Sequence, residues 1–300
     1  MMRESELLQH IAARSRGLVT GAGWEVVCGP GDDCAVMRSQ TGDVTLLTVD
    51  QLVEGRHFTP GTDPGLIARK SVARSVSDIA AMGGEPAWAL GTGVLPAGYP
   101  NARALFDAMS EWAAHFGCPL IGGDLATHSS RDHPLTLTVT VGGAMHADVA
   151  PVLRSGAAPG DLLWLTGPVG GSFTSGRHLT FEPRIDAGRR LAVAGAHAMI
   201  DLSDGLGRDA GRMAAASGVR IEIDTATLPL HPGVATWRAG VSDGEDYELL
   251  IAAPSSSLNG IAGLHGPVGR VLPRGQGDAG AWFLDPDGTS LRADEMGWDH

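Results

Sequence analysis

Apolar positions in the first half of the chain recur at the spacings of an α/β protein. Residues 5–16 repeat apolar side chains at helical spacing, and residues 63–84 do so over a longer run between an Asp-Pro start and a Gly-Gly end. A second long helix is predicted from Asn101 to Gly117. Strands are predicted where apolar residues alternate, or run together, between turn residues: at 34–37, 44–49, 87–94 and 135–141.

The periodicity is interrupted near the middle of the chain. Residues 150–160 contain two prolines and two glycines and show little repetition of apolar positions, which is typical of a domain boundary. A glycine-rich stretch at 167–176 follows the first strand of the second half, and 274–280 is predicted to be a loop. The remaining elements alternate in type, with strands expected at 161–166, 219–224 and 247–252 and helices at 189–198 and 201–216.

Composition and charge narrow the class of protein. The chain has 300 residues, of which 43% are apolar, and this is enough for two cored domains or one large one. Its net charge is −12, it has 22 basic residues, and Lys70 is its single lysine. Because binding to nucleic acid depends on neutralising phosphates with basic clusters, nucleic acid is not expected as a partner. Solubility alone would also account for the acidic surface charge.

Localisation signals and cysteine usage favour the cytoplasm. No apolar run reaches the roughly 18 residues that span a bilayer, and the first 16 residues are too charged for a signal peptide. The three cysteines form no C-x-x-C pair. This pattern indicates reduced thiols and no membrane partner.

Short acidic clusters are the main candidates for chemistry. Each lies beside glycine or at the end of an apolar run, and no Lys-bearing phosphate loop accompanies them. Carboxylates at strand ends are costly unless they are solvated, paired or bound to a cation. Since Mg²⁺ prefers carboxylates, water and substrate phosphates, the pattern predicts metal-dependent phosphate chemistry. The six clusters are Gly31-Asp32-Asp33, Thr48-Val49-Asp50, Ser77-Asp78, Gly122-Gly123-Asp124, Asp201 to Leu206, and Asp243 to Glu248.

Structural alternatives exist for the clusters in the first half. The Gly-Asp-Asp sequence at 31–33 also fits a turn with local hydrogen bonds. Asp50 follows a strand, where it would serve equally as a cap. Asp78 lies four residues after Arg74, so the two side chains would form a helical ion pair. A lone His57 is often structural, although it can also donate to phosphate.

The second half offers similar alternatives. Asp201 or Ser203 would cap a helix, and helix starts also attract phosphate, which a metal would bridge to the carboxylates. Residues 243–248 fit a solvated loop, or a site in which a carboxylate faces a cationic ligand. Arg154 is either a surface residue or a clamp for phosphate oxygens.

Taken in order, the motifs resemble those of the thiamine-monophosphate kinases, within the aminoimidazole-ribonucleotide-synthetase-like ATP-binding proteins. The resemblance runs from about residue 5 to residue 300, and the combination of motifs is more specific than any one of them. The segments that carry it are GDDCAV, TVDQLVEGRHF, RSVSDIAAMGGEPAWAL, IGGD, RSGAAPGD, IDLSDGL, DGEDYELL and GWDH.

The resemblance implies a fold and a reaction. The fold would be α/β, of the α+β type, with an N-terminal ATP- and Mg²⁺-binding domain at 1–148 and a C-terminal αβ domain at 149–300. Two N-terminal domains would pair through their sheets into a homodimer with nucleotide near the interface. The enzyme would transfer the γ-phosphoryl group of ATP to thiamine monophosphate, with several Mg²⁺ ions and no strong general base.

The resemblance also implies roles for individual residues. Gly123, Asp124, Arg154 and Ser203 match nucleotide contacts. His57 and Glu245 match contacts to thiamine phosphate, and Trp298 or Glu295 occupies the terminal aromatic region. The metal positions of the family match Asp33, Thr48, Val49 (through its carbonyl), Asp50, Asp78, Asp124, Asp201 and Asp204.

The chain departs from the family pattern at several places. Leu125 and Val49 stand where threonine is usual, Glu295 replaces an aromatic residue, and the segment 167–184 is short. These departures motivate two rival functions: the same chemistry on a different small acceptor, or a non-catalytic nucleotide-binding dimer. The hydrogenase-maturation relatives need a C-terminal cysteine tail, whereas this sequence ends in MGWDH. Selenophosphate synthesis needs a reactive cysteine in a Gly-Lys context, which Cys28 and Cys34 lack.

Overall fold

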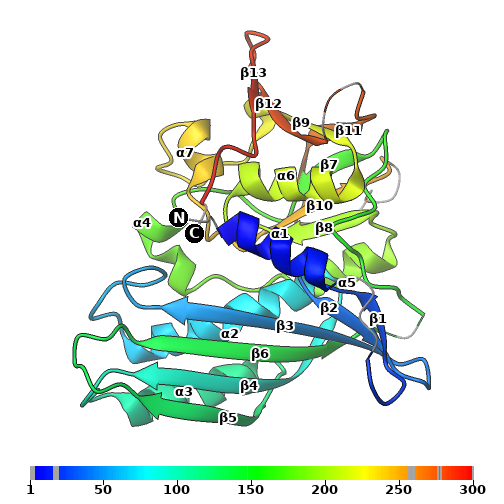
Figure 1. The fold of residues 1–300 in the computed structure, drawn as a ribbon. Helices are drawn as coiled ribbons and strands as arrows, with labels where there is room; N and C mark the ends of the chain where they lie inside the picture. The colour runs from blue at the N-terminus through cyan, green and yellow to red at the C-terminus, as the bar shows by residue number, and fades with distance from the viewer. Residues whose placement is uncertain are drawn as a thin grey trace.

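A computed structural model describes most of the chain and shows two mixed sheets, one above the other (Figure 1). Seven α-helices accompany the sheets in the described part of the chain, and none of them is both long and apolar enough to cross a membrane. The described residues are 4–15, 20–146, 148–255, 258, 261–275, 277 and 279–298.

The first sheet has the strand order β1-β2-β3-β6-β4-β5. Its neighbours are antiparallel except β4 and β5, which run parallel. Because β4 and β5 are parallel, a crossover must join them, and α3 (Ala102–His115) provides it. The strands are β1 (Glu25–Cys28), β2 (Ala35–Arg38), β3 (Val44–Val53), β4 (Glu85–Leu95), β5 (Leu120–Thr127) and β6 (Thr136–Ala144).

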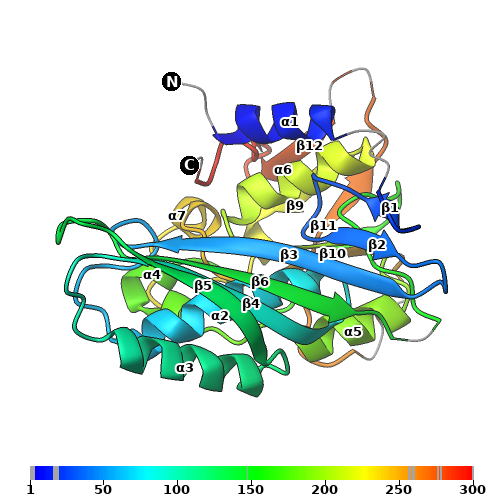
Figure 2. The same ribbon diagram turned by 60° about the horizontal axis from the view of Figure 1, so that its bottom comes forward.

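One face of this sheet carries helices and the other does not. Helix α2 (Pro64–Ala81) and α3 lie behind the sheet in Figure 1, and the turned view in Figure 2 shows the strands from another side. On the opposite face, Val49, Thr140 and Leu90 share one row across β3, β6 and β4. Val49 is 62% exposed and Leu90 is 36% exposed. This face is therefore apolar in part and uncovered in the single chain.

The second sheet has the order β13-β12-β9-β11-β7-β10-β8, with one parallel pair between β12 and β9. Its strands are β7 (Leu162–Leu165), β8 (Ala198–Asp201), β9 (Arg220–Asp224), β10 (Leu249–Ala253), β11 (His265–Leu272), β12 (Gly280–Leu284) and β13 (Ser290–Arg292). The other helices are α1 (Glu4–Arg14), α4 (Ser172–Ser175), α5 (Ile185–Val193), α6 (Leu206–Ser217) and α7 (Trp237–Ser242), with 3₁₀ turns at Arg177–Leu179 and Thr225–Thr227.

Helix α2 connects the two halves. It packs on β3 and β6 of the first sheet and also contacts α5 and β8 of the second half. The core of the first half accordingly includes Phe181 and Tyr247, whose rings stack with centroids 4.0 Å apart. Residues from both halves therefore pack around α2.

The sequence predicted α2 well and other elements less well. The Asp63 carboxylate caps α2 by accepting from the amides of Gly65 and Leu66, as the Asp-Pro start predicts. The helix expected at 189–198 instead spans Ile185–Val193, and its last predicted residue begins β8. Gly122 to Asp124 lie within β5 rather than after a strand. Strand β11 was not predicted.

Candidate functional site

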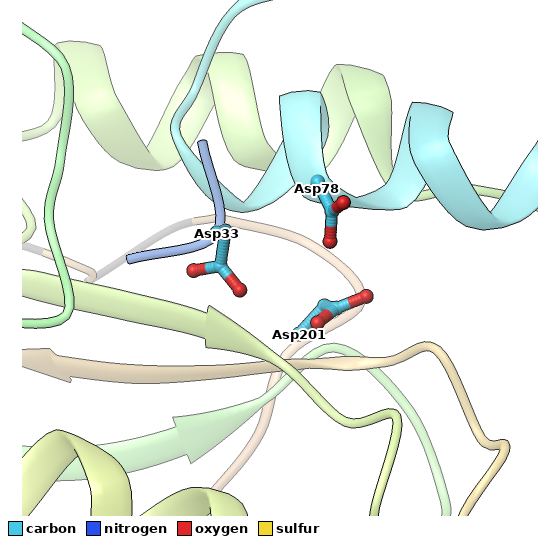
Figure 3. A group of neighbouring side chains, drawn as sticks. All are labelled: Asp33, Asp78 and Asp201. Atoms are coloured by element: carbon cyan, nitrogen blue, oxygen red, sulfur yellow. The ribbon is translucent and has the colours of Figure 1, made fainter. Parts of the chain in front are cut away.

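Three carboxylates from distant segments meet between the two sheets. Asp33 precedes β2, Asp78 lies on α2, and Asp201 ends β8 (Figure 3). Each offers an oxygen, and these oxygens lie within 4.8 Å of one another. We call these three residues the acidic group. Its members belong to three of the clusters that the sequence singled out.

Hydroxyl groups rather than cations surround most of the acidic group. Thr48 Oγ1 donates to Asp78, and Ser77 Oγ donates to Asp201 Oδ2 at 2.6 Å. Among the described residues, Arg154 supplies the one ion pair to the group, with Nη2 2.6 Å from Asp33 Oδ1. The other oxygen of Asp33 is buried and finds no hydrogen-bond partner among the described residues.

This arrangement leaves negative charge uncompensated. Burial raises the pKa of Asp78 well above its usual range, and the nearby carboxylates of Asp50, Asp201 and Asp33 raise it further. Burial likewise raises the pKa of Asp201, with Asp33 as the next cause. The donors are all oxygens, which is the set that Mg²⁺ prefers. The acidic group therefore fits a hard divalent cation.

The structure decides among the structural alternatives that the sequence left open: a turn, a helical ion pair and a helix cap. Asp32 takes the turn role, accepting from the amides of Asp33 at 3.0 Å and of Arg154, while Asp33 joins the acidic group. Burial and Asp33 raise the pKa of Asp32 to about 6. Arg74 does not pair with Asp78, since its guanidinium lies 3.5 Å from Asp50 instead. Asp201 does not cap α6, whose N-cap is Gly205.

The other predicted metal residues differ in their contacts. Asp50 is engaged by Arg74, and Asp204 forms an ion pair with Arg212 at 2.5 Å. Thr48 touches the group through its hydroxyl, whereas the Val49 side chain faces the uncovered side of the sheet.

Gly123 and Asp124 lie apart from the acidic group. They are exposed residues of the edge strand β5 and line a hollow with Phe106 and Leu125. Three inter-strand spacings separate β5 from β3, or about 14 Å. A single protomer therefore does not bring these predicted nucleotide contacts to the acidic group, which Arg154 does contact.

A pocket adjoins the acidic group. Ser203 and Asp204, which follow Asp201, line it together with Arg74, one turn from Asp78 on α2. His57 and Glu245 line it too. Its cavity volume is about 20 Å³, and it is partly open to solvent. Two predicted substrate residues therefore share one pocket beside the acidic group.

Aromatic side chains form the outer part of the pocket. Trp298 and Phe173 line it, and Arg56 lies over the Trp298 ring, 5.5 Å from the centroid. Trp298 Nε1 donates to the carbonyl of Asp243 at 2.7 Å, which holds the indole in place. Glu295 is exposed and is not among the lining residues. Asp299 and His300, the end of the GWDH motif, lie outside the described residues.

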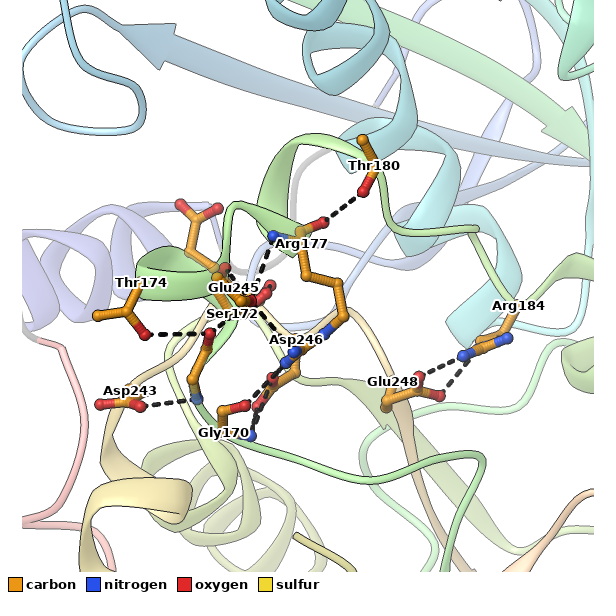
Figure 4. Close-up of polar contacts among 12 residues, drawn as sticks. Gly170, Ser172, Thr174, Arg177, Thr180, Arg184, Asp243, Glu245, Asp246 and Glu248 are labelled. Carbon is orange, nitrogen blue, oxygen red and sulfur yellow. Dashed lines mark hydrogen bonds and ion pairs between the residues drawn. The ribbon is translucent and has the colours of Figure 1, made fainter. Parts of the chain in front are cut away.

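The loop 243–248 is a network of ion pairs (Figure 4). Asp246 pairs with Arg177 at 2.9 Å, and Glu248 pairs with Arg184. Burial still raises the pKa of Asp246 to about 7, although the Gly170 amide and Arg177 lower it. Asp246 and Glu248 are buried, so the structural alternative of a solvated loop does not hold for these two residues.

Glu245 has a partner that the sequence analysis did not find. Lys70, fully buried on α2, contacts the Glu245 carboxylate and donates to the His57 carbonyl at 2.6 Å. Its Nζ also lies 2.8 Å from His178 Nδ1. Burial lowers the pKa of Lys70 to about 8 in spite of Glu245. Its being the single lysine, within an apolar helical stripe, was the available signal.

Backbone conformation positions the pocket wall. Glu245 and Tyr247 adopt φ of 59° and 53°, a left-handed conformation that is rare for such side chains. Their amides donate to the carbonyls of Ser203 and Leu202 at 2.8 and 2.9 Å. These bonds tie the loop 243–248 to the segment that follows the acidic residue Asp201.

Comparison with family models and with curated proteins gives consistent matches. The models for the N-terminal and C-terminal domains of AIR synthase related proteins match residues 31–145 and 158–258. The thiamine-monophosphate kinase of Salmonella typhimurium is 32% identical over 321 residues, covering 97% of each chain. That of Rhodopirellula baltica is 36% identical, covering 82% of this chain and 81% of its own length.

Solved structures give the same match. The structure of AaThiL complexed with AMPPCP and TMP has a TM-score of 0.83 and 27% identity, and covers 99% of this chain and 97% of that one. The hydrogenase maturation protein HypE in complex with ATP shares the fold at 16% identity, with a TM-score of 0.70, covering 83% of this chain and 84% of that one.

Proposed function

The chain belongs to the thiamine-monophosphate kinase family of the AIR synthase related proteins, and on that premise we propose that it phosphorylates thiamine monophosphate with ATP. The products are thiamine diphosphate and ADP. The observation that carries the proposal is the acidic group beside a pocket that holds both charged and aromatic side chains. One end suits metal and phosphates, and the other suits an aromatic cation.

The acceptor determines what the protein must do. A phosphate monoester oxygen is already ionised near neutral pH, so it attacks the γ-phosphoryl group without a strong base. What opposes reaction is repulsion between two phosphates, and positioning with charge neutralisation overcomes it. Mg²⁺, when bound, would supply positive charge that offsets the charge of the phosphates.

The chain's residues have distinct parts in this proposal. Asp33, Asp78 and Asp201 would hold Mg²⁺, and Asp50 and Asp204 would serve as further ligands. Thr48 and Ser77 orient the carboxylates through their hydroxyls. Arg154 bridges Asp33 and the nucleotide phosphates.

The acceptor contacts complete the assignment. His57 and Glu245 contact the acceptor, with Glu245 toward the cationic thiazolium and Trp298 against a ring. His57 Nδ1 accepts from the Val53 amide at 2.9 Å, which fixes the orientation of its imidazole.

A homodimer is part of the proposal. The uncovered sheet face presents Val49 and Leu90, and apolar faces of this kind are buried in stable assemblies. In this dimer, the predicted nucleotide contacts Gly123 and Asp124, which lie about 14 Å from β3 within one protomer, would be near the interface. We also propose that residues 1–148 and 149–300 are the two domains, and that the protein is cytoplasmic, where its three free cysteines stay reduced.

Disrupting the uncovered sheet face tests the homodimer. Leu90→Glu places a charge in the row with Val49 and Thr140, so it should convert the dimer to a monomer without unfolding it. Sedimentation equilibrium measures the mass. The matched control is Val193→Glu, at an apolar residue that is also exposed but lies on α5 away from this sheet. A monomeric wild-type protein, or an unchanged dimer in Leu90→Glu, would rule out this interface.

Product formation tests the reaction directly. Thiamine monophosphate, ATP and Mg²⁺ are incubated with the protein, and thiamine diphosphate is measured by chromatography with thiamine as the control acceptor. Product from the monophosphate alone is expected. If ATP binds and no product forms, the acceptor is a different molecule or the chain is a nucleotide-binding protein.

A further inference from the structure

Arg74 is an arginine of the pocket that no part of the proposed function uses. It projects from α2 one turn before Asp78, and its side chain is 11% exposed. Its Nη1 donates to the carbonyl of Gln51 at 2.8 Å, which anchors one edge of the guanidinium. Its Nε is buried and has no hydrogen-bond partner among the described residues.

The ion pair of Arg74 is weak. Nη2 lies 3.5 Å from Asp50 Oδ1, which is beyond the usual length of a charge-assisted hydrogen bond. In the same region Arg154 reaches Asp33 at 2.6 Å. A guanidinium has five N–H donors, so Arg74 keeps donors available at Nε and Nη2.

The charges that line the pocket point to an anion at Arg74. Of the three carboxylates that line the pocket, Asp204 pairs with Arg212 and Glu245 with Lys70, both outside the lining. The third, Asp243, accepts from the Gly171 amide at 2.7 Å. Arg56, the other lining arginine, lies over Trp298 at the aromatic part of the pocket. Arg74 is therefore the cation at the part that adjoins the acidic group.

We propose that Arg74 binds the phosphate of the acceptor and so fixes the orientation of the acceptor in the pocket. The phosphate faces α2 and the acidic group, and the aromatic part faces Trp298. This inference rests on the proposed function and deepens it. A guanidinium suits phosphate because its planar fork matches two oxygens. It also offsets the repulsion that an acceptor phosphate meets near several carboxylates.

The test compares two ligands that differ only in phosphate. Thiamine monophosphate and thiamine are titrated into the wild-type protein and Arg74→Gln by isothermal calorimetry, without nucleotide. Arg74→Gln should weaken binding of thiamine monophosphate by about 10- to 100-fold, the size of a lost charged hydrogen bond. Its affinity for thiamine should stay within about twofold, since thiamine has no phosphate to lose.

Arg56→Gln is the matched control. It removes the pocket's other guanidinium, at the aromatic part, so both ligands should weaken by the same factor. Arg74→Lys keeps the charge and loses the fork, and should weaken only thiamine monophosphate, by about 3- to 10-fold. If Arg74→Gln does not fold, Arg74→Lys still tests the proposal.

Several results would overturn the inference. One is an equal loss of affinity for both ligands in the Arg74 variants. Another is an unchanged affinity of these variants for thiamine monophosphate. The third is a wild-type protein that binds thiamine as tightly as thiamine monophosphate. The proposed function fails separately, if wild-type protein forms no thiamine diphosphate. Product formation together with full affinity in Arg74→Gln would remove only the role of Arg74.

Discussion

The acidic group and the loop 243–248 are both dense in carboxylates, and they differ in what neutralises them. In the loop, each of Glu245, Asp246 and Glu248 has its own cation, from Lys70, Arg177 and Arg184. In the acidic group (Figure 3), the described residues supply one arginine for three carboxylates. The hydroxyls of Thr48 and Ser77 donate further hydrogen bonds to Asp78 and Asp201.

This difference separates two uses of buried charge. A buried carboxylate with its own cation stabilises one arrangement of the chain, and removing the cation is costly. A buried carboxylate without one is costly as it stands, and a bound cation relieves the cost. The loop therefore shapes the pocket wall, while the acidic group is the site that we propose for a metal ion.

Neutralising one member of the acidic group should have the largest effect. Asp201→Asn keeps a side-chain oxygen near Ser77 and removes a buried charge. We expect kcat to fall by about 10³-fold or more, because a metal supplies several kcal/mol of charge stabilisation. The metal-free protein should melt no lower than wild type, since burial disfavours the charge that is lost. Turnover within about tenfold of wild type would place the metal elsewhere.

Removing a cation from the loop should instead affect stability. Arg184→Ala leaves Glu248, 7% exposed at its side chain, without its ion pair. We expect the free energy of unfolding, measured in urea, to fall by about 2 kcal/mol. Arg189→Ala is the matched control, because Arg189 is about as exposed as Arg184 (41% against 37%), but its carboxylate partners are exposed and lie 3.6 Å away. An equal loss in both variants would mean that the loop's pairs are no stronger than surface pairs.

A third prediction concerns the pH dependence of stability. The pKa of Lys70 is about 8 in the folded protein and 10.5 ordinarily, so between these values the unfolded chain binds more protons. The contribution of Lys70 to the free energy of unfolding therefore rises between about pH 8 and pH 10.5, by up to about 1.4 kcal/mol per pH unit. Lys70→Met should flatten that rise in urea unfolding at stepped pH. The same slope in wild type and variant would show that Lys70 is not the group responsible.

Local sequence patterns predicted the elements that begin and end at characteristic residues. The Asp63-Pro64 start and the Gly83-Gly84 end define α2 without help from the rest of the fold. Strand β11 was not predicted, because its pairing with β7 and β9 decides it more than its own pattern does.

Part of the candidate site was predictable, because its residues have local sequence patterns of their own. Asp33, Asp78 and Asp201 stand out in the sequence because they are flanked by glycine or apolar residues. Their meeting depends on α2 lying between the two sheets, which no local pattern encodes. The partners of the loop, Lys70 and Arg184, are more than 60 residues away from their carboxylates, so spacing did not reveal them.

Metal binding is the most direct test of the contrast between the two regions. Mn²⁺, as a paramagnetic substitute for Mg²⁺, is titrated into wild type, Asp201→Asn and Glu248→Gln, and free Mn²⁺ is measured by electron paramagnetic resonance. We predict that wild type and Glu248→Gln bind Mn²⁺ with similar affinity and that Asp201→Asn binds it at least about tenfold more weakly. Equal binding by all three proteins would contradict the assignment of the metal to the acidic group.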